Sequence, residues 1–381
     1  MTPAVPVTRP GRDGAAVRPA ESLVLSAWSA VSPFGTGAAC YRDGLRADRG
    51  AVTDLDQEVF PGPYTRAGVV PDFSAAGALG RKGTRTMDRV TALAVSAFGN
   101  LLESCAPGLL DRPERVGLVL GTGSGSVQSI MDFTRDSLTG ERPYLVDPAR
   151  FPNTVMNRAA GQSAIWHGIK GPNTTVSAGW LTGLHVLGYA ARLHRGGHCD
   201  RVLCGSAEEY SVQRAWLEWH AAGPGLRPPL AEGCAVWLME TDAAAREAGR
   251  TPLARLLGTR FRGCQEAEEA PAALSACVRE ALESVGASAR DVRLVVPLGA
   301  GGEERTVLDA LPGADPVRIG CRRLLGDASA AATAFQIVAV LARAEDRLWS
   351  DGALALVTGV DRDGTVGCAL LGAGPGSGAT G

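Results

Sequence analysis

Runs of apolar residues that alternate between strand-like and helix-like spacing extend through almost the whole of the 381-residue chain. Short β-branched runs bounded by Gly, Pro or charged residues predict buried strands at residues 22–27, 116–120, 174–177, 201–205, 235–240, 292–297, 353–358 and 365–371. Apolar residues with a helical period predict helices at residues 86–104, 181–195, 273–284 and 328–344. This alternation predicts an α/β fold in which helices pack on the faces of sheets.

The succession of strands and helices occurs twice along the chain. We predict a longer N-terminal half over residues 21–247 and a shorter C-terminal half over residues 248–372. Residues 1–20 and 373–381 contain mostly small and polar residues with Pro and Gly, so we expect two disordered tails. No strict short-period repeat is visible, which argues against solenoids and propellers.

Composition and charge narrow the classes of partner. The formal net charge of −2 comes from interspersed signs, so nucleic acid and anionic membrane surfaces are not expected partners. No apolar run approaches the ~20 residues that span a bilayer, and residues 1–20 lack the apolar segment of a signal peptide. The 9 cysteines form no Cys-x-x-Cys pair, which is typical of reduced, buried thiols. We therefore predict a cytoplasmic protein that binds small molecules or other proteins.

One segment has the pattern of a strand, a tight turn and a helix. The apolar β-branched run 174–176 is followed by the small residues 177–179, then by Trp180 and a helical period. Such an elbow places one side chain at the start of a helix, where backbone N–H groups stabilise a thiolate or an oxyanion. An indole cannot act as the nucleophile, so the geometry for presenting a nucleophile is predicted here without the nucleophile itself.

The elbow and several further motifs, in order, resemble the β-ketoacyl synthases of the thiolase fold over residues 22–371. The motifs are Ala27-Trp-Ser-Ala-Val-Ser-Pro-Phe-Gly35, Arg85-Thr-Met-Asp-Arg89, Gly121-Thr-Gly-Ser-Gly125, Phe151-Pro-Asn-Thr-Val-Met-Asn157, Gly168-Ile-Lys-Gly-Pro172, Glu208-Glu209 and Glu232-Gly-Cys-Ala-Val236. The resemblance implies a thiolase-like fold with duplicated α/β halves in a layered αβαβα arrangement. The glycine-rich stretch 121–125 is read as a tight turn rather than a phosphate site, because no Gly-Lys-Ser/Thr follows it.

The resemblance also places three positions where the family keeps its catalytic Cys, His and His. Trp180 stands at the cysteine position, Leu298 at the first histidine and Asp327 at the second. A leucine donates no hydrogen bond, and a carboxylate would repel an enolate, whereas an Asp at a helix start caps free N–H groups. In the loop that follows, Arg362 stands where the family has its gating aromatic residue. The resemblance therefore implies a chain with no catalytic residue of its own.

None of the five histidines supplies an obvious replacement. His185 lies on the predicted helix after the elbow and is read as structural, while His194 and His198 flank a glycine-broken helix end beside Cys199. That spacing is weak evidence for a metal site, and we predict no metal and no cofactor.

As a ketosynthase-like chain without the catalytic residues, the protein resembles a chain length factor, the inactive partner of the ketosynthase in a type II polyketide synthase. The resemblance implies a heterodimer with an active ketosynthase, and an acyl carrier protein whose phosphopantetheine thioesters the partner would use. The tunnel or interface residues expected on this basis are Phe151, Thr154, Met156, Trp180 and Arg362. Trp180 either blocks the old acyl pocket and limits chain growth or only fills a relict void. Two alternatives stay open, which are an acyltransferase or condensing enzyme with a remodelled site and a docking scaffold for the carrier protein.

Overall fold

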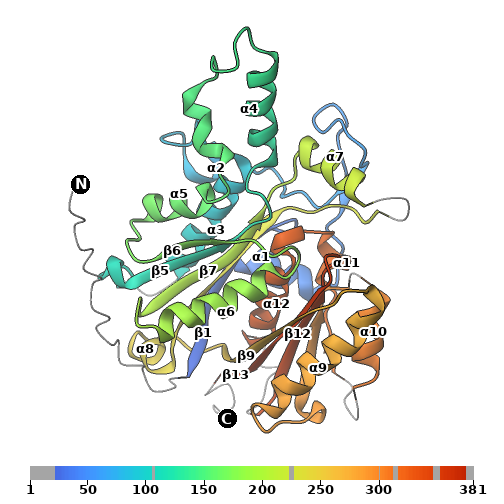
Figure 1. Ribbon diagram of the computed structural model, residues 1–381. Coiled ribbons are helices and arrows are strands. Elements are labelled where there is room, and N and C mark those ends of the chain that lie inside the picture. The colour runs from blue at the N-terminus through green and yellow to red at the C-terminus, as the bar shows by residue number, and fades with distance from the viewer. Residues whose placement is uncertain are drawn as a thin grey trace, which may run out of the picture.

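A mixed β-sheet crosses the molecule in the computed structural model, which describes residues 22–104, 108–222, 227–299, 301–311, 316–345 and 352–374 (Figure 1). The strands follow the order β11-β10-β12-β13-β9-β1-β8-β7-β5-β6. In the N-terminal half these are β1 (Leu23–Ser32), β5 (Val116–Gly121), β6 (Asn173–Val176), β7 (Arg201–Glu208) and β8 (Gly233–Thr241). In the C-terminal half they are β9 (Ala254–Gly263), β10 (Val292–Pro297), β11 (Val317–Arg318), β12 (Leu354–Val360) and β13 (Thr365–Ala373).

The two halves repeat one topology. In the N-terminal half, the strands β6, β5 and β7 run parallel, and β8 and β1 continue the sheet as antiparallel strands. In the C-terminal half, β11, β10 and β12 run parallel, and β13 and β9 continue the sheet as antiparallel strands. The halves meet where β1 pairs with β9 through Val24–Arg255 and Leu25–Ala254. The predicted duplication is confirmed, and the passage between halves falls between α8 (Asp242–Glu247) and β9.

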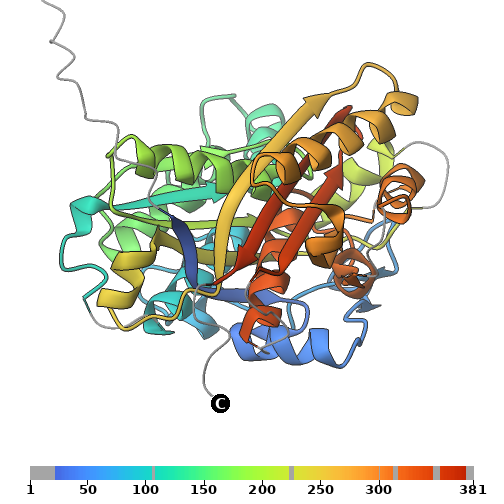
Figure 2. The same ribbon diagram turned by 90° about the horizontal axis from the view of Figure 1, so that it is seen from below.

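Helices form the other layers. The helices α3 (Arg89–Ser104) and α5 (Arg158–His167) cover one face of the N-terminal strands, and α9 (Ala270–Glu283) with α10 (Gly302–Asp309) covers the outer face of the C-terminal strands, as Figure 2 shows for α9. Between the halves, α6 (Thr182–Arg195) packs against α12 (Ala332–Glu345). Because α12 is apolar almost all round its circumference, it is buried on all sides at the centre. Three separate apolar clusters lie between these layers, which gives the αβαβα arrangement predicted from the sequence.

The remaining elements are short or lie at the periphery. They are β2 (Gly35–Thr36), β3 (Thr53–Asp54), β4 (Arg66–Ala67), α1 (Ala38–Arg46), α2 (Ala75–Leu79), α4 (Val127–Thr139), α7 (Val212–Ala221) and α11 (Cys321–Leu325). The helix α4 and the 3-10 segment η2 (Pro148–Thr154) stand away from the sheet as an arm at the top of Figure 1. Within α4 only Val127 is buried, which is why its pattern gives no helical period facing a core.

Several expectations about the chain as a whole can be compared with the structure. The strand β13 continues to Ala373, two residues beyond the predicted strand end, while residues 1–20 and 375–381 of the predicted tails lie outside the described residues. The cysteines within the described ranges are all free thiols, most of them buried. Among the helices of the described ranges, none has the length and apolar character needed to cross a membrane.

Candidate functional site

The elbow after β6 forms as the sequence predicts. Gly179 has a left-handed backbone (φ 50°), and a Cβ at this position would lie 2.1 Å from a carboxylate oxygen of Asp361, so only glycine fits. The Thr182 hydroxyl donates to the Gly179 carbonyl at 2.7 Å and accepts from the Ala178 N–H at 2.9 Å. These contacts hold Trp180 at the turn into α6, the place that the sequence assigned to a nucleophile.

Two guanidinium groups lie against the Trp180 indole. The Cζ atom of Arg322 is 4.7 Å from the ring centroid and that of Arg362 is 5.5 Å from it, both within cation–π range. Each arginine is also paired with a carboxylate, Arg322 with Asp327 at 2.6 Å and Arg362 with Glu218 at 3.0 Å. The half-buried indole thus contacts the arginine of each of two ion pairs.

A cavity of about 1360 Å³ brings the predicted site residues together. Trp180, Leu298, Asp327 and Arg362 all line its wall, although they are far apart in the sequence. Seven of the described residues that line it are arginines, Arg362 among them. Five of these pair with carboxylates: Arg66 with Asp54, Arg318 with Asp309, Arg322 with Asp327, Arg323 with Asp48, and Arg362 with Glu218. The charge of this wall is therefore largely balanced within the chain itself.

Leu298 presents only its alkyl side chain to the cavity, because its backbone is committed elsewhere. Its N–H donates to the Thr358 carbonyl at 3.1 Å and to Glu304 Oε1 at 3.0 Å, and the Gly299 N–H donates to Glu304 Oε2 at 2.7 Å. Glu304 is buried, and this burial raises its pKa from the ordinary carboxyl value. The carboxyl group thus shapes the loop that carries Leu298.

Asp327 lies just before a helical turn and accepts a backbone N–H there. Its Oδ1 accepts the Ser329 N–H at 2.9 Å, at the start of the 3-10 turn η5 (Ser329–Ala331) that leads into α12. Its Oδ2 pairs with Arg322, and both side chains are largely buried. Since both carboxylate oxygens have partners, Asp327 acts as part of the scaffold of the cavity wall.

Asp361 is a site residue that the sequence reading missed. The Asp361 carboxylate accepts a hydrogen bond from the backbone N–H of Trp180, and Asp361 is only 5% exposed. The pKa of Asp361 is raised above the ordinary carboxyl value, mainly by burial and further by the negative charge of Asp363. The hydrogen bond from the Trp180 N–H lowers this pKa and so partly opposes the two. The sequence draws attention to Arg362 at this loop, whereas the preceding residue makes the contact with the elbow.

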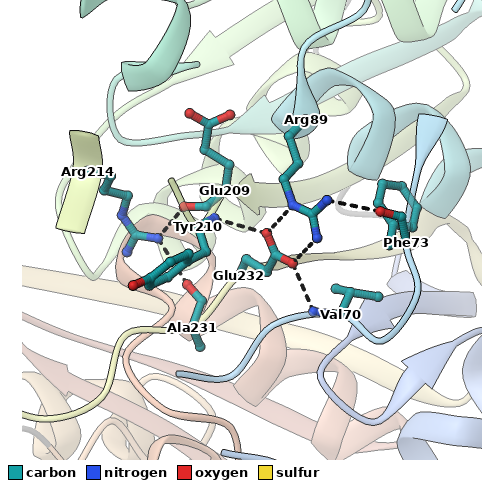
Figure 3. Close-up of polar contacts among 8 residues, drawn as sticks. All are labelled: Val70, Phe73, Arg89, Glu209, Tyr210, Arg214, Ala231 and Glu232. Carbon is teal, nitrogen blue, oxygen red and sulfur yellow. Dashed lines mark hydrogen bonds and ion pairs between the residues drawn. The ribbon is translucent and has the colours of Figure 1, made fainter. Parts of the chain in front are cut away.

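Buried carboxylates connect the other motifs of the sequence. Glu232 accepts from the Arg89 guanidinium, from the Val70 N–H at 2.8 Å and from the Tyr210 N–H at 3.0 Å, while Arg214 donates to the Glu209 and Ala231 carbonyls (Figure 3). Arg89 and Glu232 come from two motifs of the sequence reading, and the structure joins them in one network. This network fixes the segments before α3 and β8 relative to one another.

The glycine-rich stretch 121–125 is a loop held by the two consecutive glutamates after β7. The Gly123 N–H donates to Glu208 Oε2 at 3.1 Å, and Ser126 Oγ and the Gln128 N–H each donate to Glu209 Oε1 at 3.2 Å. Burial raises the pKa of Glu209 to about 8. Glu209 therefore holds the point where the arm, α4 and η2, begins.

The structure separates the expected tunnel residues into two groups. Trp180 and Arg362 line the cavity, whereas Phe151, Thr154 and Met156 lie on or beside the arm and do not line it. Phe151 is 57% exposed and packs edge to face on Phe133. The arm surface, defined as the exposed apolar side chains of residues 131–156, comprises Met131, Leu138, Tyr144, Leu145, Phe151, Val155 and Met156.

Known proteins of one family match this chain. The family model described as beta-ketoacyl synthase, N-terminal domain, matches residues 20–245. The chain is 30% identical over 325 residues to a putative polyketide beta-ketoacyl synthase 2 of Streptomyces coelicolor, which covers 77% of this chain and 74% of that protein. It is 25% identical over 258 residues to a 3-oxoacyl-(acyl-carrier-protein) synthase 2 of Vibrio harveyi, with 62% of this chain covered. The matched region spans only 61%, 49% and 45% of three such bacterial synthases.

Solved structures share the fold over nearly the whole chain. A structure of the ishigamide ketosynthase/chain length factor has a TM-score of 0.83 and 41% sequence identity, covering 92% of this chain and 99% of that one. The complex AntDE:AntF, a type II polyketide synthase acyl-carrier protein with its ketosynthase bound to the hexaketide, has a TM-score of 0.76 over 93% of this chain. At 18% identity, this second likeness shows the fold alone.

Proposed function

Because the chain belongs to the β-ketoacyl synthase family and has its thiolase-like fold, we propose that it is a chain length factor, a non-catalytic subunit of a type II polyketide synthase. It pairs with an active ketosynthase and shapes the tunnel in which a polyketide grows. The observation that carries the proposal is the chemistry of the cavity wall around Trp180, Leu298 and Asp327. The similarity to the ishigamide ketosynthase/chain length factor supports it.

The three positions where the resemblance places the catalytic Cys, His and His hold side chains unsuited to acyl transfer. Among the described residues that line it there is no Cys, His, Ser or Thr. Covalent catalysis needs a nucleophile with a base beside it, and decarboxylation needs donors that stabilise the developing negative charge. Trp180 and Leu298 supply neither, and both oxygens of Asp327 are occupied by Arg322 and the Ser329 N–H. These contacts support a wall that shapes the cavity rather than one that carries out the reaction.

Two surfaces suit a partner of the same fold. The strand β6 is at the end of the sheet and, among the strands that the structure describes, pairs with β5 alone, so its outer edge can accept a strand of another chain. The arm surface exposes several large apolar side chains, and exposed apolar patches of this kind commonly mark protein interfaces. In the proposed heterodimer the partner covers both, and Phe151, Thr154 and Met156 face the shared tunnel.

The wider setting follows from the proposed pairing. The active ketosynthase takes acyl groups from the phosphopantetheine thiol of an acyl carrier protein, and this chain needs no cofactor or metal. We place the pair in the cytoplasm, where reduced cysteines are stable.

Co-expression with an active ketosynthase from the same biosynthetic system tests the proposal. We expect the two chains to elute together at equal stoichiometry in size-exclusion chromatography, and the chain alone to aggregate or to self-associate weakly, because an obligate interface of this kind buries on the order of 2,000 Å² or more. After incubation with acyl-loaded carrier protein, intact mass spectrometry should detect acylation of the partner only. Stoichiometric acylation of this chain would instead support the alternative of a remodelled acyltransferase, and a stable monomer would contradict the pairing.

A further inference from the structure

The N–H of Trp180 lies at the turn into α6, where an active elbow would use such donors to bind an anion. In this chain the donor already has a partner, the carboxylate of Asp361, which comes from the loop between β12 and β13. Within the first turn of α6, the Gly183 N–H has a separate side-chain partner, Thr333 Oγ1 at 2.8 Å. We propose that Asp361 is a built-in occupant of the elbow anion site, which keeps the site silent independently of the residue at position 180. This inference rests on the proposed non-catalytic function and adds a second cause of it.

The loop is built to deliver the carboxylate. The Asp361 N–H donates to the Thr365 carbonyl at 2.7 Å, and the Gly364 N–H returns to the Asp361 carbonyl at 3.3 Å. Gly364 has φ 83°, a conformation that glycine adopts without strain. On the other side, Gly179 leaves the space that the carboxylate fills, since a Cβ there would lie 2.1 Å from Asp361 Oδ2. Loop and elbow are thus complementary in shape.

Charge makes this occupant effective. A thiolate or an oxyanion at the elbow would lie beside the carboxylate of Asp361, and like charges at such a distance disfavour one another. The other charged groups around the loop are Asp363, Arg362 with its partner Glu218, and Arg322 with its partner Asp327. The two arginines face the indole and are paired with other carboxylates, so they offset a new negative charge at the elbow less than unpaired cations would.

A thiol introduced at the elbow measures the effect directly. In the full-length chain, purified with its partner, we compare Trp180→Cys with Trp180→Cys/Asp361→Asn, because asparagine can still accept the backbone N–H but carries no charge. The matched control is Trp180→Cys/Asp363→Asn, which removes an exposed charge from the same loop. The rate of iodoacetamide alkylation of the introduced thiol is followed from pH 6 to pH 10 by peptide mass spectrometry, with the native cysteines as internal references.

We expect the thiol of Trp180→Cys to react slowly at pH 7, and Asp361→Asn to lower its apparent pKa by at least about one unit and raise that rate about tenfold. Asp363→Asn should change the rate less than threefold. Equal effects of the two loop variants, or a reactive thiol in Trp180→Cys alone, would overturn the inference. Asp361→Ser serves as a second variant if asparagine prevents folding, as judged by circular dichroism. The readout is the alkylation of a thiol on this chain and needs no acyl transfer, and the same comparison is made on the chain alone if no pair forms, so the proposed function fails or stands separately.

Discussion

The site cavity and the arm have opposite characters. Around the cavity, polar groups are matched within the chain, since Arg322 pairs with Asp327, Arg362 pairs with Glu218, and Asp361 takes the Trp180 N–H. The arm instead exposes large apolar side chains such as Met131 and Phe151. Paired charges around the cavity and an uncovered apolar surface on the arm are what the proposed function expects of a chain that acts through a partner.

A charge on the arm surface should have the largest effect. Met131→Asp places a carboxylate where the partner is expected to cover α4, and burying an unpaired charge is costly, so we expect affinity for the ketosynthase to fall at least about 100-fold. Val317→Asp is the matched control, because Val317 is similarly exposed but lies on β11 at the opposite end of the sheet. Both are measured by surface plasmon resonance or co-purification. Equal losses in the two variants would remove the arm from the interface.

Breaking the cavity wall should cost stability rather than affinity. Arg322→Ala leaves the largely buried Asp327 without its cation, and the loss of one member of a buried pair destabilises by about 3 kcal/mol. The neighbouring Arg323 pairs with Asp48 in an exposed position, so Arg323→Ala should cost less than about 1 kcal/mol. Urea denaturation of the purified complex gives both values. Equal losses of stability in Arg323→Ala and Arg322→Ala would show that the largely buried pair of Arg322 and Asp327 contributes no more than an exposed one.

The same contrast explains what sequence reasoning could predict. Buried strands such as β5 and β10 are rich in apolar residues, and their predicted bounds agree with the structure to within one residue. The strand β7 continues three residues beyond its predicted end at residue 205. The central strand β9 was missed because its sequence, Ala-Arg-Leu-Leu-Gly-Thr-Arg-Phe-Arg-Gly, mixes arginines and glycines and is only partly buried. The exposed α4 was missed because it packs against little of the body. A regular spacing of apolar residues indicates burial within the chain, so elements that are exposed or only partly buried are hard to recognise from the sequence.

The candidate site shows a similar division. Trp180, Leu298 and Asp327 were identified through motifs, and the structure brings them to one cavity. The role of Asp361 could not be predicted, because its contact with Trp180 spans 181 residues and depends on the space beside Gly179. That Phe151 and Trp180 occupy different surfaces likewise needed the tertiary structure. Their assignment to one tunnel stays a prediction that the product profile tests.

Truncation of the two aromatic residues separates the arm from the cavity in chain-length control. Phe151→Ala should enlarge the shared tunnel and shift the reconstituted pair toward longer products, since a packed wall resists each added unit by about 1–3 kcal/mol of strain. Trp180→Ala removes a side chain that lines a different cavity, so the shift should be smaller. The acylation rate of the partner is the control and should remain unchanged. Unchanged products in both variants, with the heterodimer intact, would favour the docking scaffold.

The junction of arm and body should respond to pH through Glu209, which accepts from Ser126 and from the N–H of Gln128 at the start of α4. Burial raises its pKa in the folded chain to about 8, above the unfolded value, so the unfolded state binds fewer protons between these values. The stability contributed by this group is therefore present at low pH and is lost as pH rises from about 4.5 toward 8, at up to about 1.4 kcal/mol per pH unit.

Glu209→Gln keeps an oxygen that accepts both hydrogen bonds but removes the titration, so its urea stability should fall less steeply between pH 6 and pH 8 than that of the unaltered chain. Glu218→Gln, also a carboxylate of the site region, is the control because Glu218 pairs with the half-exposed Arg362. Its urea stability shows how much of any change comes from removing a carboxylate of this region other than Glu209. At pH 8 the arm of the unaltered chain should also exchange its amide hydrogens faster than the arm of Glu209→Gln, after correction for intrinsic rates. The reason is that ionisation of the buried Glu209 carboxyl weakens the packing of the arm on the body. Identical slopes and identical exchange in the two variants would place the control of the arm outside this junction.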